Sequence, residues 1–185
     1  MPVVKVYNNG FTCGVAPMKN NHLRSLRGET NGWTTTTSRS NTRFLYSVVP
    51  DQLLGHGYAF TFTVKNLPPT PDDWEKCRSK LVKRLRRMGM IRLHWLTEWQ
   101  RRGVPHLHGV VYFPDELSPM QINRLTDHWR ASAAEFEPSS IAQDIKPITS
   151  ALGWLEYLSK HAARGVYHYQ RNGKPSAWKK TGRMW

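Results

Sequence analysis

Apolar and polar residues alternate in the segment 58–64, where Phe60-Thr61-Phe62-Thr63-Val64 places every second side chain on the same side. This period of two is typical of a half-buried β-strand. Residues 91–100 and 104–113 are also strand-like, and only Arg101-Arg102-Gly103 separates them. A short turn between two such runs predicts a β-hairpin.

Helical signals follow the strands. Thr70 is a good N-cap residue and Pro71 suits the first helical position, so we expect a helix that ends near Gly89. Its apolar positions are Trp74, Cys77, Leu81, Leu85 and Met88. Residues 118–121 resemble a capping box, which predicts a second helix to about residue 136. A last helix should run from about residue 149 to residue 163.

The ends of the chain carry weaker signals. Residues 1 to about 40 are polar, so we expect an irregular arm there and a short helix at about 38–49. The mixed order of strands and helices, with hairpins, predicts an α+β fold in which helices pack on an antiparallel sheet. We expect an N-terminal arm with a short helix (1–50), a core (51–165), which includes a short strand near 141–145, and a basic aromatic C-terminal tail (166–185).

The charge of the chain is strongly positive. Lys and Arg number 27 against 13 Asp and Glu, which gives a net charge of +14. This balance favours a polyanionic partner. No basic amphipathic helix with a wide apolar face suggests a membrane surface, and no apolar run reaches the roughly 20 residues of a membrane span. The first ten residues carry no signal-peptide pattern and the two cysteines are far apart, so we expect a cytoplasmic protein.

The strand 104–113 contains Pro105-His106-Leu107-His108. Residues i and i+2 of a strand share a face, so both imidazoles project together. A hairpin turn centred near residue 102 would place Glu98 opposite His106, whereas a slip of one residue would turn Glu98 away. Two histidines and a carboxylate suit a divalent metal such as Mn²⁺, Mg²⁺ or Zn²⁺. The alternative is that these histidines are ordinary polar groups of a strand.

The predicted last helix carries a reactive stripe. Tyr157, Lys160, His161 and Arg164 share a helical face that differs from the apolar stripe of Leu152, Leu155, Leu158 and Ala162. This stripe would be an ordinary basic outer face if it stood alone. Beside a metal site, the Tyr157 hydroxyl can attack a phosphodiester, and Lys160 can position the phosphate.

Basic residues outside that stripe are candidates for DNA contacts. Arg101 and Arg102 occupy the hairpin turn, and Lys179 and Lys180 lie in the basic tail. Single-stranded DNA is usually held by basic grooves with stacking aromatic residues. We therefore group these four residues with His161 and Arg164 as candidate DNA-binding residues. Trp95 and Trp99 share the strand face opposite to Glu98, which favours the core for both.

Three motifs occur in the order found in HUH endonucleases. They are Phe60-Thr61-Phe62-Thr63, His106-Leu107-His108 and Tyr157-Leu158-Ser159-Lys160. On these motifs the chain resembles the single-tyrosine rolling-circle replication initiators (Rep proteins) of small filamentous phages and plasmids. The resemblance covers roughly residues 58–164.

The resemblance implies a central antiparallel sheet of about five strands flanked by helices. It implies that Tyr157 cuts single-stranded origin DNA, leaving a 5′-phosphotyrosine and a free 3′-OH, with Mn²⁺ or Mg²⁺ held by Glu98, His106 and His108. The chain has no Walker A sequence, so a helicase and a polymerase of the bacterial host, or of a partner, would act with it. A single-tyrosine transposase and a non-catalytic single-stranded nucleic-acid-binding module remain alternatives.

Overall fold

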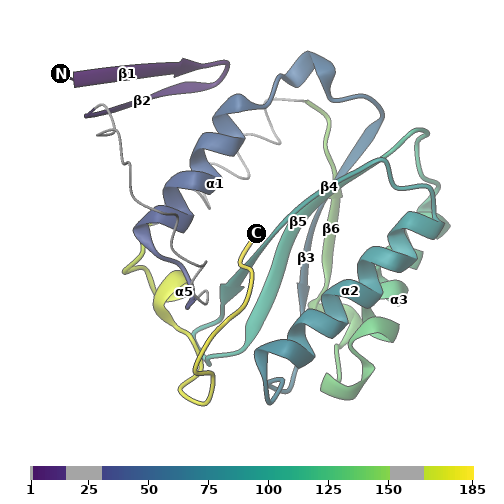
Figure 1. Cartoon of the computed structure of the whole chain (residues 1–185). Coiled ribbons are helices and arrows are strands. Elements are labelled where there is room, and N and C mark those ends of the chain that lie inside the picture. Colours follow the sequence, from purple (N-terminus) through teal and green to yellow (C-terminus); the bar gives the residue numbers. More distant parts are fainter. Residues whose placement is uncertain (1, 16–30, 151–164) are drawn as a thin grey trace.

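The structure is a computed structural model that describes residues 2–15, 31–150 and 165–185 (Figure 1). Its main sheet has four antiparallel strands in the order β4-β5-β3-β6. Their bounds are β3 His56–Thr63, β4 Arg92–Trp99, β5 Pro105–Phe113 and β6 Asp144–Pro147. The α+β fold class is therefore confirmed. The resemblance implied about five strands in this sheet, and the described residues contribute four. The other two strands, β1 and β2, pair with each other in a separate sheet.

Two helices cover one face of the main sheet, side by side (Figure 1). They are α2, Pro71–Arg87, and α3, Pro119–Ser132, which is followed by short 3-10 turns at Ala134–Phe136 and Ser140–Ala142. Thr70 caps α2, and Ser118 and Gln121 form the expected capping box of α3. The aromatic ring of Phe62 stacks on Trp129, with the centroids 5.6 Å apart, so β3 and α3 share one apolar core.

The opposite side of the sheet carries α1, Thr35–Ser47, and the short α5, Tyr169–Asn172 (Figure 1). A 3-10 turn, Pro50–Gln52, follows α1. Phe44 of α1 stacks on His94 of β4, with the ring centroids 5.1 Å apart. None of the helices in the part of the chain that the structure describes is long and apolar enough to span a bilayer.

The N-terminal arm contains more regular structure than we predicted. β1, Pro2–Tyr7, and β2, Gly10–Val15, form an antiparallel hairpin, so the prediction of an irregular segment is wrong there. The β-branched run Val3-Val4-Lys5-Val6 and the turn residues before Gly10 are a hairpin signal that the polar composition outweighed. The helix expected at 38–49 begins earlier, because Thr34 accepts a hydrogen bond from the Thr37 amide as its N-cap.

The C-terminal tail packs against the core. Trp178 and Met184 are buried, and the Thr97 amide donates to the Met184 carbonyl over 2.8 Å, so the tail lies along the outer edge of β4. The Gly32 amide donates to the Thr181 hydroxyl, which brings the arm and the tail together beside β4. Trp99 is fully buried and Trp95 is partly buried against the core, as expected.

Candidate metal centre

The hairpin β4–β5 has the register that the sequence predicted. Glu98 pairs directly with His106, and Leu96 pairs with His108. The turn closes with a hydrogen bond from the Gln100 amide to the Val104 carbonyl, and Gly103 takes φ +75°, which favours glycine. The turn therefore fixes the register, and the register brings Glu98 to the face of the two histidines.

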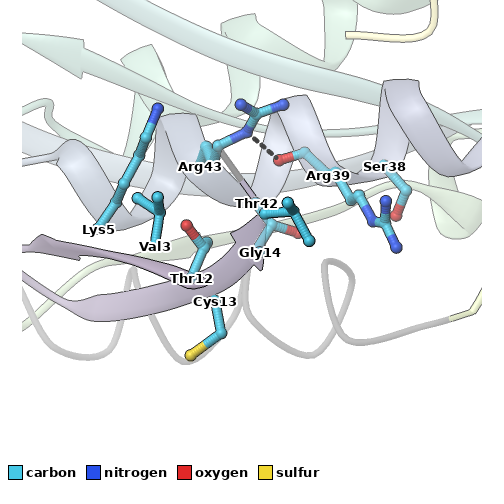
Figure 2. Close-up of a pocket in the computed structure, with 10 residues that line it drawn as sticks. Val3, Lys5, Thr12, Cys13, Gly14, Ser38, Arg39, Thr42 and Arg43 are labelled. Atoms are coloured by element: carbon cyan, nitrogen blue, oxygen red, sulfur yellow. Dashed lines mark hydrogen bonds between the residues drawn. The ribbon is translucent and has the colours of Figure 1, made fainter. Parts of the chain in front are cut away.

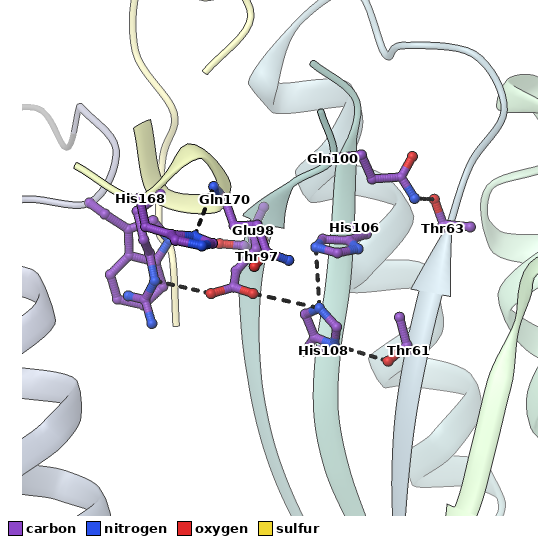
Figure 3. Close-up of polar contacts among 11 residues, drawn as sticks. Thr61, Thr63, Thr97, Glu98, Gln100, His106, His108, His168 and Gln170 are labelled. Carbon is purple, nitrogen blue, oxygen red and sulfur yellow. Dashed lines mark hydrogen bonds and ion pairs between the residues drawn. The ribbon is translucent and has the colours of Figure 1, made fainter. Parts of the chain in front are cut away.

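Glu98, His106 and His108 form one buried cluster (Figure 3). The Nε2 atoms of the two histidines lie 3.2 Å apart, and Glu98 Oε2 is 3.6 Å from His108 Nε2. One potential ligand atom from each residue lies within 4.8 Å of the others. Two imidazole nitrogens that bind one ion at about 2.1 Å each are about 3.0–3.4 Å apart for bond angles from perpendicular to tetrahedral. The donor set and its spacing fit a divalent cation.

β3 supplies a support for this cluster. Thr61 pairs with His108 across the sheet, and its Oγ1 lies 2.9 Å from His108 Nδ1 (Figure 3). When Nδ1 carries the ring proton and donates it to Thr61, Nε2 directs its lone pair into the cluster. Phe60 and Phe62 point to the other face, where Phe62 packs on α3. In the alternating segment of β3, Phe60 and Phe62 therefore face the apolar core, and Thr61 faces the cluster.

Glu98 has a second charged neighbour. Arg171 of α5 donates from Nε to Glu98 Oε1 over 3.0 Å, and both side chains have an exposed fraction of 0%. The guanidinium of Arg171 lies 3.5 Å from the centroid of the Trp33 ring. Sequence analysis missed both residues, because Arg171 was one of many tail cations and Trp33 lay in the supposed irregular arm.

Comparisons with known proteins bear on this arrangement. The family model described as "Replication-associated protein ORF2/G2P" matches residues 57–162, a range that includes all three cluster residues. The chain belongs to this family of replication-associated proteins. The similarity extends to individual relatives, which match the chain over all of its 185 residues.

Two of these relatives are putative replication proteins of Xylella fastidiosa. The one from strain 9a5c is 48% identical over 188 residues, covering 100% of the chain and 66% of the relative. The one from strain Temecula1 is 47% identical, covering 100% of the chain and 71% of the relative. The replication-associated protein G2P of Pseudomonas phage Pf3 is 43% identical over 190 residues, covering 100% and 68%. The chain thus spans about two thirds of the length of these relatives, and no solved structure matches it.

The candidate DNA-binding residues fall into two groups, of which only the first lies in the described part of the chain. Arg101, Arg102, Lys179 and Lys180 are exposed. Arg101 lies over the Tyr169 ring, 5.0 Å from its centroid. Arg102 donates to the Val64 and Lys65 carbonyls, so these hydrogen bonds connect the hairpin turn to the residues that follow β3. Tyr157, Lys160, His161 and Arg164, with the predicted last helix, lie outside the described residues, and their roles stay predictions.

Two other titratable groups of the described residues, His94 and Cys77, are not part of the cluster. Burial lowers the pKa of His94 to about 4, so this imidazole is neutral at pH 7. Burial raises the pKa of the Cys77 thiol to about 11, which keeps it protonated and unreactive. A separate pocket lies between the N-terminal hairpin and α1 (Figure 2). It has Lys5, Arg39 and Arg43 among its lining residues and contains none of the potential metal ligands.

Proposed function

We propose that this protein is a HUH-type, single-tyrosine nickase that cuts single-stranded DNA at a replication origin. The cluster of Glu98, His106 and His108 is the observation that carries the proposal, because its donor set and spacing suit a divalent ion. Membership of a replication-associated family supports a role at an origin. Its place of action would be the cytoplasm of a bacterial host.

Glu98, His106 and His108 would hold Mn²⁺ or Mg²⁺, which supplies polarisation of a phosphate oxygen when bound. The Tyr157 oxygen then attacks the scissile phosphorus, and Lys160 contacts the phosphate. The bond between phosphorus and the 3′-oxygen breaks, and the proton given up by Tyr157 balances the proton that the 3′-hydroxyl gains. The products are a 5′-phosphotyrosine and a free 3′-OH for a polymerase. Attack by that hydroxyl reverses the reaction and rejoins the strand.

Exposed groups near the end of the β4–β5 hairpin suit the single strand. Tyr167 is 90% exposed, and Tyr169 lies under Arg101 with 42% of its surface exposed. Bases stack on such rings while arginine contacts the phosphates. Arg102, Lys179 and Lys180, together with His161 and Arg164, are the other proposed phosphate contacts. A host or partner helicase and polymerase would act with the protein at the origin.

A trapping experiment tests the function without knowledge of the origin. The protein is incubated with a pool of random single-stranded oligonucleotides and Mn²⁺ and is then run on a denaturing gel. We expect a slower band that resists denaturant, depends on metal and is absent in Tyr157→Phe, which should still bind DNA. An adduct in Tyr157→Phe would assign the nucleophile elsewhere, and an adduct formed in EDTA would exclude the metal role.

The same experiment separates the alternatives. Tight binding of the pool with no covalent product, in metal and with the native tyrosine, would favour a non-catalytic binding module. Joining of cut hairpin ends by a dimer would favour a transposase. Sequencing of the trapped DNA would identify the recognised site.

A further inference from the structure

Glu98 lies between two different environments. Its Oε2 faces the histidines, and its Oε1 accepts the hydrogen bond from Arg171 Nε. The two carboxylate oxygens are thus used separately, one toward the candidate metal site and one toward a buried cation. A hydrogen-bond partner that is itself held in a fixed direction orients a ligating carboxylate.

Arg171 has such a fixed direction. Its guanidinium carbon Cζ lies over the Trp33 ring, 3.5 Å from the ring centroid, and the Trp33 Nε1 donates to the Thr97 carbonyl over 2.8 Å. Thr97 precedes Glu98 in β4. The contacts therefore close a ring from β4 through Trp33 and Arg171 and back to β4, which restrains the position of the guanidinium.

The backbone around Arg171 is held in place as well. The Arg171 amide donates to the His168 carbonyl over 2.8 Å, and Gly173 ends the short helix α5. A Cβ on Gly173 would lie 2.6 Å from the Tyr169 carbonyl oxygen, so a side chain at this position would clash with the backbone of its own turn, and it would also crowd Trp99 Cβ of β4 at 3.1 Å. Trp178, buried and hydrogen-bonded to the Pro68 carbonyl, anchors the tail beyond it.

We propose that Arg171 is the positioning residue of the metal ligand Glu98, and that residues 31–33 and the tail together tune metal affinity. The inference rests on the proposed function, because it requires that the cluster binds a divalent ion. Arg171 itself does not touch the DNA, since its side chain is fully buried. Its contribution is the orientation of Glu98 Oε2 toward His108.

A purely structural role is the competing explanation, and the chain offers a matched control. Arg78 of α2 is also a buried arginine over a tryptophan of β4, with its guanidinium 3.9 Å from the Trp95 centroid. Its acidic neighbour is Glu75 at 3.7 Å, and Trp95 faces away from the cluster. Arg78 therefore shares the burial and the stacking of Arg171 but has no contact with Glu98.

The test measures Mn²⁺ binding by electron paramagnetic resonance in the full chain without DNA. Arg171→Lys keeps the positive charge near the ion, but lysine has neither a planar guanidinium to place over Trp33 nor an Nε donor in the same place. We expect the dissociation constant to rise by about 10- to 100-fold. Arg78→Lys should bind Mn²⁺ as the native protein does, even if thermal unfolding shows that both variants lose stability.

A second measurement shows whether Arg171 acts through Glu98. In a Glu98→Gln background, Arg171→Lys should cause no further loss of affinity, because the oriented carboxylate is already absent. Native affinity in Arg171→Lys, or equal losses in Arg171→Lys and Arg78→Lys, would overturn the proposal while leaving the metal site in place. No binding of Mn²⁺ by the native protein would instead refute the metal site, and the positioning role with it.

Discussion

Thr61→Val is the sharpest test of how the sheet prepares the candidate metal centre. Valine has nearly the shape of threonine, so the change removes the hydroxyl and leaves the packing of β3 in place. His108 Nδ1 then loses the oxygen that lies 2.9 Å away. Loss of one partner of a buried polar group costs about 1–3 kcal/mol in the free energy of unfolding.

This cost converts into measurable quantities. For a chain of this size, about 2–4 °C of melting temperature corresponds to each kcal/mol, so we expect a decrease of about 2–12 °C in Thr61→Val. The imidazole of His108 also loses a restraint on its orientation and tautomer. Loss of such a restraint lowers metal affinity or activity by about 10- to 100-fold.

The assay combines thermal unfolding with the formation of the covalent DNA adduct at limiting Mn²⁺. Thr61→Ser is the matched control, because it keeps the hydroxyl and removes only a methyl group. We expect Thr61→Ser to retain most of the adduct yield and Thr61→Val to lose it. Native metal dependence and a native melting temperature in Thr61→Val would refute the reasoning.

Two further predictions concern stability. A Cβ at Gly109 would lie 2.3 Å from Phe60 Cζ and 2.7 Å from the His94 carbonyl oxygen. Gly109→Ala should therefore lower the free energy of unfolding by about 1–3 kcal/mol. Gly14→Ala is the control, because a Cβ there has no atom within 4 Å, and it should leave the melting temperature unchanged. Because the pKa of buried His94 is lowered to about 4, the unfolded chain binds more protons below pH 6.5, so stability should fall between pH 6.5 and pH 4. At pH 5 the loss is about 2 kcal/mol, and His94→Phe, which keeps a ring on Phe44, should remove that part of the slope in melting temperature against pH. An equal slope in both proteins would contradict the assignment to His94.

The sequence alone determined the features that depend on neighbours in the chain. The alternation at residues 58–64, the caps at Thr70 and Ser118, and the turn at Arg101-Arg102-Gly103 each involve a few adjacent positions, and the structure confirms them. Glu98 and His106 were placed opposite each other for the same reason, because a tight turn sets the register of the hairpin that it closes. The potential metal ligands were therefore predictable.

The N-terminal hairpin also has a local signal in the sequence. Val3, Val4 and Val6 favour a strand, although the first 40 residues are polar as a whole. The structure shows that the short β-branched run decides the outcome, because β1 and β2 form a hairpin there. Its pairing is local as well, so the information was present in the sequence.

Only the tertiary structure decided what surrounds the cluster. Arg171 lies 73 residues from Glu98, and Trp33 lies 64 residues from Thr97. Neither residue belongs to a periodic pattern that points to its partner. Their positions depend on the docking of residues 31–33 and of the tail along the edge of β4, which reflects the shape of the completed sheet and the burial of Trp178 and Met184. Periodicity in a sequence reports which face a side chain occupies, whereas the distant segment that covers this face is decided by tertiary packing, which brings together residues far apart in the chain.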